Sequence, residues 1–301
     1  MNLYDFYKKQ IEVSFEVVAA DKELATHIQE VLIWLRLLDA PSDGKFGPVS
    51  TAAIKQFQKL MKSSDYGYLG PETAKKLIQT SPDDLPQPGL LLGNDLASRI
   101  IKYMQKKGYQ IATGNQEYNI VYLEGTNADG TLNRDAPNQF NDRRMVIQIV
   151  NGKATILGNW EGTTEPGYYY TYHPMNPKGA ARIAFGQYKS WRVGTHGNSE
   201  PHEALVQVAP IKVHRDANKD TMRSGDATEE GLFAVNQHWG YDYPRINIGL
   251  ASAGCLVGRT RDGHREFMKI IKQDRRYQMN NDYLFLTAVI AGDDLLKQFP
   301  S

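Results

Sequence analysis

The sequence contains a single cysteine, Cys255, and a histidine, His238, a short way upstream of it. A cysteine attacks a carbonyl only as the thiolate, and a free thiol is ionised to only a few per cent near neutral pH, so it needs a base or a positive charge nearby. His238 is the candidate base. A lone cysteine is also a common small buried side chain, and its type alone does not separate the structural role from the catalytic one.

Small residues precede the thiol in the run Ser252-Ala-Gly-Cys255. They suit a tight turn in which backbone N–H groups approach a bound carbonyl, because glycine adopts backbone conformations that other residues avoid. The sequence therefore favours a reactive cysteine at this turn, and a turn with a purely structural role is the alternative.

Two motifs, His238-Trp-Gly240 and Ser252-Ala-Gly-Cys255, resemble the catalytic signature of the L,D-transpeptidase family in its variant form, as in phage and cyanobacterial proteins. Members of that family attack a peptidoglycan stem peptide with the cysteine, release the terminal D-residue, and pass the acyl group to an amine or to water. The run that begins Thr163-Thr-Glu-Pro-Gly167 is similar to an element that precedes these motifs in the family.

The resemblance implies a role for each residue of the motif. Cys255 would be the nucleophile and His238 its base. Gly254 with Cys255 would form the backbone part of an oxyanion hole, and Ser252 belongs to the same catalytic motif. No cofactor and no metal is implied.

Two positions depart from the family pattern. Val257 stands where an arginine is common, with Arg259 the nearest arginine, and Ala253 stands where a histidine is common. These changes leave the nucleophile and the base in place. They leave open the acyl donor and the choice between amine and water.

Several side chains near the motif are candidates for binding substrate. Trp239 and Tyr241 could line a stem-peptide groove, and Arg245 or Arg259 could meet a carboxylate. His196 precedes a glycine, so it is either a rival base or part of the substrate wall. Aromatic residues beside a strand are also common in cores.

Zinc chemistry is an alternative, because His196, His202 and His238 could together hold a metal ion. The sequence has no His-Glu-x-x-His pair, and three separate segments would have to converge.

Residues 23–80 resemble the small peptidoglycan-binding domain of many wall-acting enzymes. Helical apolar spacing occurs from Leu24, and two later helices begin at Gly-Pro pairs, at residues 47–48 and 70–71. The run Asp43-Gly-Lys-Phe-Gly-Pro48 carries the resemblance. The turns that end in the two Gly-Pro pairs form a degenerate internal repeat.

The remaining segments complete an α+β organisation with a small three-helix domain and a mainly β, L,D-transpeptidase-like catalytic domain. Residues 1–22 are expected to be an irregular lead-in, and 81–93 a Pro-rich linker. Residues 94–301 form the catalytic domain, with a helix, a hairpin at Asn151-Gly152 and a strand over 231–237 that delivers His238.

Composition limits the partners. The 301 residues are 41% hydrophobic and 23% charged, as in an ordinary folded protein. A formal charge of +1 gives no electrostatic case for nucleic acid. The first residues lack the apolar run of a signal peptide or a membrane span, so we expect a protein that is cytoplasmic as synthesised and reaches the wall after release or non-classical export.

Three hypotheses follow for the function. The first is a cysteine acyl-transfer enzyme, a transpeptidase or carboxypeptidase, with peptidoglycan as its partner. The second is a non-catalytic wall-binding or phage-associated protein with a degenerate catalytic fold. The third is the zinc-dependent peptidoglycan peptidase. The sequence leaves the oligomeric state open.

Overall fold

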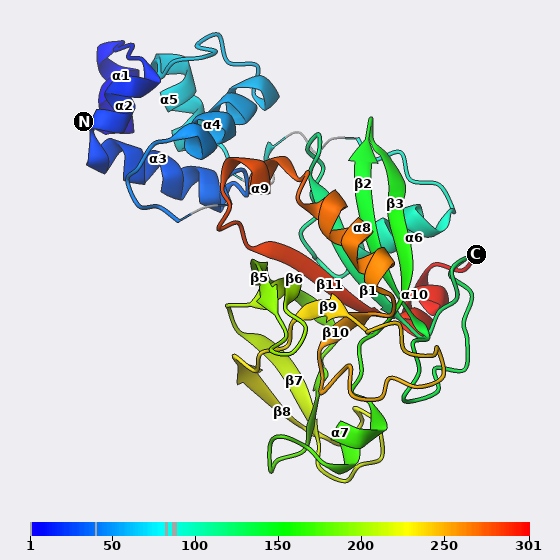
Figure 1. The fold of residues 1–301 in the computed structure, drawn as a ribbon. Helices are drawn as coiled ribbons and strands as arrows, with labels where there is room; N and C mark the ends of the chain where they lie inside the picture. Colours follow the sequence, from blue (N-terminus) through cyan, green and yellow to red (C-terminus); the bar gives the residue numbers. More distant parts are fainter. Residues whose placement is uncertain (1, 40, 82–83, 86–88) are drawn as a thin grey trace. The chain divides into compact units, whose positions relative to one another are not determined.

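The computed structural model describes residues 2–39, 41–81, 84–85 and 89–301. The chain divides into two compact units, Met1–Pro88 and Gly89–Ser301 (Figure 1). The first unit is helical and the second is rich in β-structure, so the predicted α+β class is confirmed. The boundary lies within the predicted linker, of which residues 82–83 and 86–88 lie outside the described residues.

The first unit contains five helices in its described residues: α1 Leu3–Lys9, α2 Phe15–Ala20, α3 Lys22–Trp34, α4 Pro48–Leu60 and α5 Pro71–Gln79. As predicted, Pro48 and Pro71 begin α4 and α5, where a missing N–H leaves no helical hydrogen bond unmade. The expectation of an irregular lead-in over residues 1–22 was wrong. An Asn2–Asp5 capping box starts α1, and apolar side chains of α1 and α2 pack in the same core as α3 to α5.

The repeated turns are each fastened by a buried glutamine of the preceding helix. Gln29 of α3 accepts the Gly44 amide at 2.8 Å and donates to the Lys45 carbonyl at 3.2 Å. Gln58 of α4 accepts the Gly67 amide at 3.1 Å and donates to the Tyr68 carbonyl at 2.6 Å. The degenerate repeat is therefore a repeated side-chain-to-backbone contact.

The strands of the second unit form a closed barrel and a smaller sheet. In order around the barrel they are β1 Tyr118–Glu124, β11 Phe285–Ala291, β5 Gly186–His196, β6 His202–Gln207, β9 Gln237–Trp239, β10 Leu256–Gly258, β3 Lys153–Thr163 and β2 Asp142–Val150. The smaller antiparallel sheet has the order β4 Ala180–Ile183, β7 Ile211–Asp216 and β8 Ala227–Gly231. The pairs β1–β11 and β9–β10 are parallel, and the other neighbours in the barrel are antiparallel.

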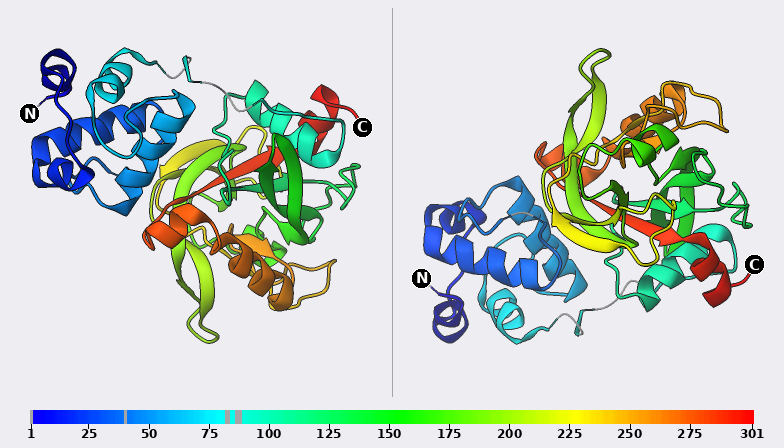
Figure 2. Two further views of the ribbon diagram at one scale, coloured as in Figure 1. Left: turned by 90° about the horizontal axis from the view of Figure 1, so that it is seen from above. Right: turned by 90° about the horizontal axis from the view of Figure 1, so that it is seen from below.

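Helices cover the barrel on more than one side. They are α6 Leu96–Lys106, α8 Arg261–Ile271, α9 Arg275–Met279 and α10 Gly292–Gln298, whereas α7 Tyr168–Tyr172 lies against β4 of the smaller sheet. Figure 2 shows α6 and α10 side by side, and both pack on one face of β1, β2 and β11. Both faces of β1 are buried, because alternate residues enter two different apolar clusters. None of the helices in the described ranges combines the length and apolar character needed to cross a bilayer.

Two local predictions had different outcomes. The Asn151-Gly152 hairpin joins β2 to β3, and both residues have positive φ, 49° and 80°, as its turn requires. The strand predicted over 231–237 was wrong, because residues 232–236 are irregular and His238 lies in the short strand β9.

The glutamine contacts give a first testable prediction. Replacing Gln58 by Ala leaves the half-buried Gly67 amide and the Asp65 and Tyr68 carbonyls without their side-chain partner. We expect a loss of about 2–4 kcal/mol in the free energy of unfolding, measured by urea denaturation. Lys59→Ala, at an exposed position of the same helix, should change it by under about 0.5 kcal/mol. Equal losses in the two variants would contradict the proposed role of Gln58.

Candidate active site

Two short parallel strands bring the candidate pair to one face of the barrel. Val257 of β10 lies opposite His238 of β9, and the Leu256 amide donates to the Asn236 carbonyl at 3.0 Å. Cys255 therefore stands immediately before β10, beside Asn236. Since alternate residues of a strand share a face, Cys255 and His238 are directed to the same side.

The turn before Cys255 requires glycine at residue 254. Gly254 has a φ of +127°, and a Cβ there would lie 2.5 Å from the Ala181 carbonyl oxygen of β4. Ser252 braces the turn, because its Oγ donates to the Cys255 carbonyl at 2.9 Å and accepts the Gly254 amide at 3.1 Å. The Gly254 amide is thus already hydrogen-bonded, and it would have to exchange that bond to serve an oxyanion.

The Cys255 thiol is half-buried and lies among backbone groups. Its Sγ accepts the Asn236 amide at 3.4 Å and donates to the Ala234 carbonyl at 3.6 Å. Burial raises the pKa of Cys255 to about 11, although the Asn236 hydrogen bond acts in the opposite direction. The thiol is therefore protonated at neutral pH.

The His238 imidazole is buried, and a backbone carbonyl fixes its tautomer. Nδ1 lies 2.8 Å from the Trp239 carbonyl oxygen, which can only accept, so Nδ1 carries the hydrogen and Nε2 is left with a free lone pair. Burial, followed by the neighbouring His196 ring, holds the pKa of His238 well below its ordinary value. The imidazole is neutral, as a general base must be before it takes a proton.

Within the described part of the chain, no hydrogen bond joins Cys255 to His238. The Sγ contacts are the two backbone groups named above, and the His238 ring stacks on His196 with ring centroids 3.8 Å apart. The arrangement is a neutral thiol and a neutral imidazole on one face, not a preformed ion pair.

Further histidines gather beside His238. His196 accepts from the Asn236 amide group at 3.0 Å, since Asn Nδ2 can only donate, and His202 stacks on Trp239 with centroids 3.7 Å apart. The zinc alternative required three separate segments to converge, which counted against it in the sequence, and the rings of His196, His202 and His238 do lie close together. Among the residues that the structure describes, however, no three His, Cys, Asp or Glu side chains are arranged to hold a metal ion.

The predicted substrate-binding residues differ in their availability. Trp239 is buried, and Tyr241 is half-buried with its ring 6.2 Å from that of His238. Arg245 and Arg259 both pair with Glu161, at 3.4 Å and 2.5 Å. A substrate carboxylate would have to compete with Glu161 for either arginine.

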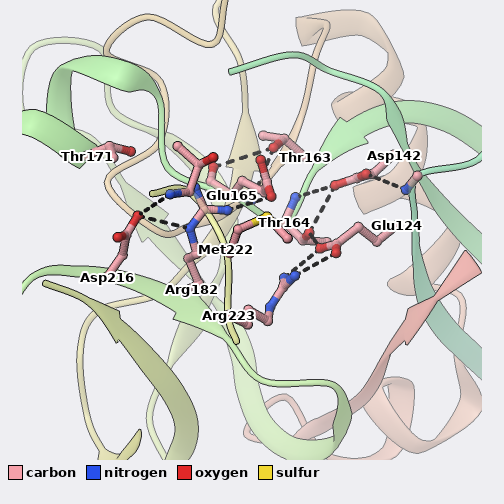
Figure 3. Close-up of polar contacts among 12 residues, drawn as sticks. Glu124, Asp142, Thr163, Thr164, Glu165, Thr171, Arg182, Asp216, Met222 and Arg223 are labelled. Atoms are coloured by element: carbon pink, nitrogen blue, oxygen red, sulfur yellow. Dashed lines mark hydrogen bonds and ion pairs between the residues drawn. The ribbon is translucent and has the colours of Figure 1, made fainter. Parts of the chain in front are cut away.

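A buried charged network, which sequence reasoning missed, lies behind the cysteine turn (Figure 3). Arg223 holds Glu124 through two bonds of 2.6 and 2.5 Å, and Arg182 donates to Glu165 at 2.5 Å. Thr163, at the end of β3, pairs with Val257 of β10. Charged residues at the ends of apolar strands were the signal in the sequence for this network. Which of them contact one another depends on the order of the strands in the two sheets.

Two carboxyl groups of this network lie against one hydroxyl group, an arrangement that a shared proton would stabilise. The Thr164 Oγ lies 2.5 Å from a Glu124 oxygen and 3.0 Å from an Asp142 oxygen, and a hydroxyl group has one hydrogen to donate. Arg223 satisfies Glu124 as a carboxylate. Burial, followed by the charge of Glu124, raises the pKa of Asp142 well above its ordinary value, so we assign the proton to Asp142.

The comparisons with known proteins bear on the first unit. Residues 22–77 match the sequence model of a family described as "Putative peptidoglycan binding domain", which confirms the resemblance stated for this segment. The protein therefore carries a segment of a wall-binding type. No curated protein sequence matches the chain.

Two solved structures are similar at low levels. A fused Zn-dependent amidase/peptidase/peptidoglycan-binding domain-containing protein from Clostridium acetobutylicum ATCC 824 shares 11% identity over 93% of this chain and 99% of its own, with a TM-score of 0.29. The L,D-transpeptidase (residues 123–326) from Xylanimonas cellulosilytica DSM 15894 shares 13% over 88% and 92%, with a TM-score of 0.21. Scores this low do not establish a common fold.

The network predicts how stability varies with pH. Burial raises the pKa of Glu165 to about 7 despite the neighbouring Arg182. The proton on Glu165 therefore stabilises the folded protein fully below the unfolded pKa of about 4.5, and this stabilisation is lost as the pH rises through about 7. Glu165→Gln should flatten the fall in unfolding free energy between pH 5 and 8 by up to about 1.4 kcal/mol per pH unit.

Urea denaturation at a series of pH values measures this slope. Glu230→Gln, at an exposed position of β8, is the matched control and should keep the wild-type slope. A Glu165→Gln variant with that same slope would show that Glu165 holds no proton in the folded protein.

Proposed function

We propose that the second unit is a cysteine acyl-transfer enzyme of the L,D-transpeptidase or L,D-carboxypeptidase type, acting on peptidoglycan stem peptides while the first unit binds the wall. The observation that supports the proposal is the placement of Cys255 immediately before β10, next to the parallel strand β9 that carries His238. The carbonyl of Trp239 leaves Nε2 of His238 free to accept a proton. The match of residues 22–77 supports peptidoglycan as the partner.

The chemistry begins from a neutral pair. The Cys255 Sγ attacks a peptide carbonyl carbon while its proton passes to Nε2 of His238. The C–N bond then breaks, the imidazolium returns the proton to the leaving amine, and a thioester remains on Cys255. An acceptor amine or water attacks the thioester and releases the thiol. Because both groups are neutral at rest, deprotonation and attack are coupled.

Cys255→Ala should abolish turnover of defined muropeptides, and His238→Gln should lower it by about 10²–10⁴-fold, because the variant lacks the proton acceptor. Product masses measure the reaction and separate transfer from hydrolysis. Circular dichroism should show that both variants stay folded. Turnover by folded Cys255→Ala would exclude the cysteine mechanism.

A second candidate is a wall-binding protein whose catalytic fold no longer supports chemistry. Three observations favour it: the raised pKa of Cys255, the lack of a hydrogen bond from its thiol to His238 in the described residues, and the engaged Gly254 amide. Residues 22–77, which match the peptidoglycan-binding family model, would suffice for binding to the wall.

Acylation separates the two candidates. Incubation with a carbapenem, followed by intact mass, should give one adduct per chain if the pair is active, and none in Cys255→Ala. If neither the drug nor muropeptides react while the protein still sediments with peptidoglycan, the wall-binding candidate holds.

A further inference from the structure

A pocket of about 660 Å³ lies within the second unit, away from the thiol, between α8, the start of β6 and the end of β9. This is large enough for a small organic ligand. Its walls are formed by His202, Glu203, Trp239, His264, Arg265, Met268, Lys269, Lys272, Gln273 and Gln278.

Cations outnumber carboxylates on these walls. Arg265, Lys269 and Lys272 come from one side of α8 and its C-terminal cap, where residues four and three apart are neighbours. Glu203 is the acidic member of the lining, and it pairs with Lys272 at 2.8 Å. Lys269 has no ion pair within the described chain, so it is free to bind an anion.

A buried guanidinium adds positive charge behind the pocket. Arg144 is fully buried, and in the described residues no carboxylate pairs with it. Its Nη1 donates to Nδ1 of His264 at 3.1 Å, while its Nε and Nη2 have no partner. The guanidinium lies over the Phe267 ring, 4.2 Å from its centroid, which compensates part of its charge, and a nearby anion would offset more of the cost of burying it.

The histidine of the rear wall links this charge to the pocket. Since Arg144 can only donate, Nδ1 of His264 accepts, and its Nε2 donates to the Glu203 carbonyl at 2.8 Å. His264 is therefore held as a neutral ring between the buried guanidinium and the pocket. It shields the guanidinium from water without cancelling its charge.

Two further ring nitrogens beside the pocket lack partners. His202 donates from Nδ1 to the Glu200 carbonyl at 2.8 Å, which leaves Nε2 as an acceptor without a partner. The Nε1 of Trp239, a donor, is likewise buried without one. Arg265 also lies over the Trp239 ring, 5.3 Å from its centroid, which holds this cation at the pocket wall.

The geometry points to an anion-binding pocket that takes a ligand with a phosphate or carboxylate group on a body the size of a sugar. Lys269 binds the anionic group, Arg265 joins it by exchanging its exposed ion pair with Asp262 for the ligand, and Met268 and the Trp239 edge contact the body. The site goes beyond the proposed acyl transfer and does not depend on Cys255. In a wall, the anion could belong to a phosphodiester polymer or to a peptide carboxylate.

Calorimetric titration of the full chain at constant ionic strength tests the site, with glycerol 1-phosphate and N-acetylglutamate as probes and N-acetylglucosamine as the neutral control. We expect one or both anions to bind and the neutral sugar to bind at least about tenfold more weakly, since a hydrogen bond to a charged group contributes that much or more. Tighter binding of the phosphate identifies a phosphodiester source, and tighter binding of N-acetylglutamate a peptide source.

Matched variants locate the binding. Lys269→Gln should weaken the preferred anion about tenfold, whereas Lys153→Gln, which removes the same charge from an exposed position of β3, should leave it unchanged. Cys255→Ala should bind like the wild type, so a failure of the acyl-transfer proposal would leave this one standing. If neither anion binds, or both lysine variants weaken binding equally, the pocket is not an anion site.

Discussion

The turn that carries the thiol depends on the close approach of Gly254 to the carbonyl of Ala181. Only a residue without a Cβ can take a φ of +127° there, and the contact ties the cysteine turn to β4. The turn lies directly before the start of β10, where Cys255 stands beside Asn236, the residue before β9. The shared face of Cys255 and His238 follows from that placement. Ser252 contributes by joining the two ends of the same turn.

Exclusion of water then decides the charge state of each buried group. It raises the pKa of the Cys255 thiol and of Glu165, and it lowers the pKa of His238. Each shift favours the neutral form. The thiol and the Glu165 carboxyl therefore keep their protons, and the His238 imidazole stays without a second one. Arg144 is the contrasting case, because a guanidinium does not give up its proton and must be buried as a cation.

Much of this arrangement was predictable from the sequence, for identifiable reasons. The helices α3 to α5 have regular apolar spacing, and α4 and α5 begin at Gly-Pro pairs, which are local signals. The pair Cys255 and His238 was found by residue type and order. By contrast, α1 and α2 have 7 and 6 residues, too few for their spacing to be distinctive, and packing on the rest of the unit stabilises them.

Contacts between distant segments could not be predicted in the same way. The bonds from Arg223 to Glu124, and from Arg144 to His264, join residues that only the barrel topology brings together. The engaged Gly254 amide depends on the conformation of one turn. These contacts decide which groups carry a proton and which backbone amides are already hydrogen-bonded, so the sequence indicates candidate residues better than it indicates their protonation and hydrogen bonds.

Closure of the barrel also protects the alignment of its two shortest strands. β9 and β10 have three residues each, and strands this short make few ladder bonds to resist sliding. A slip of one residue would turn the imidazole to the opposite face. Each of the two strands is paired on both sides, β9 with β6 and β10 with β3, in a ring that has no free edge. Sliding would require the neighbouring strand pairings to break as well. The closed barrel therefore stabilises the register that aligns the thiol and the imidazole.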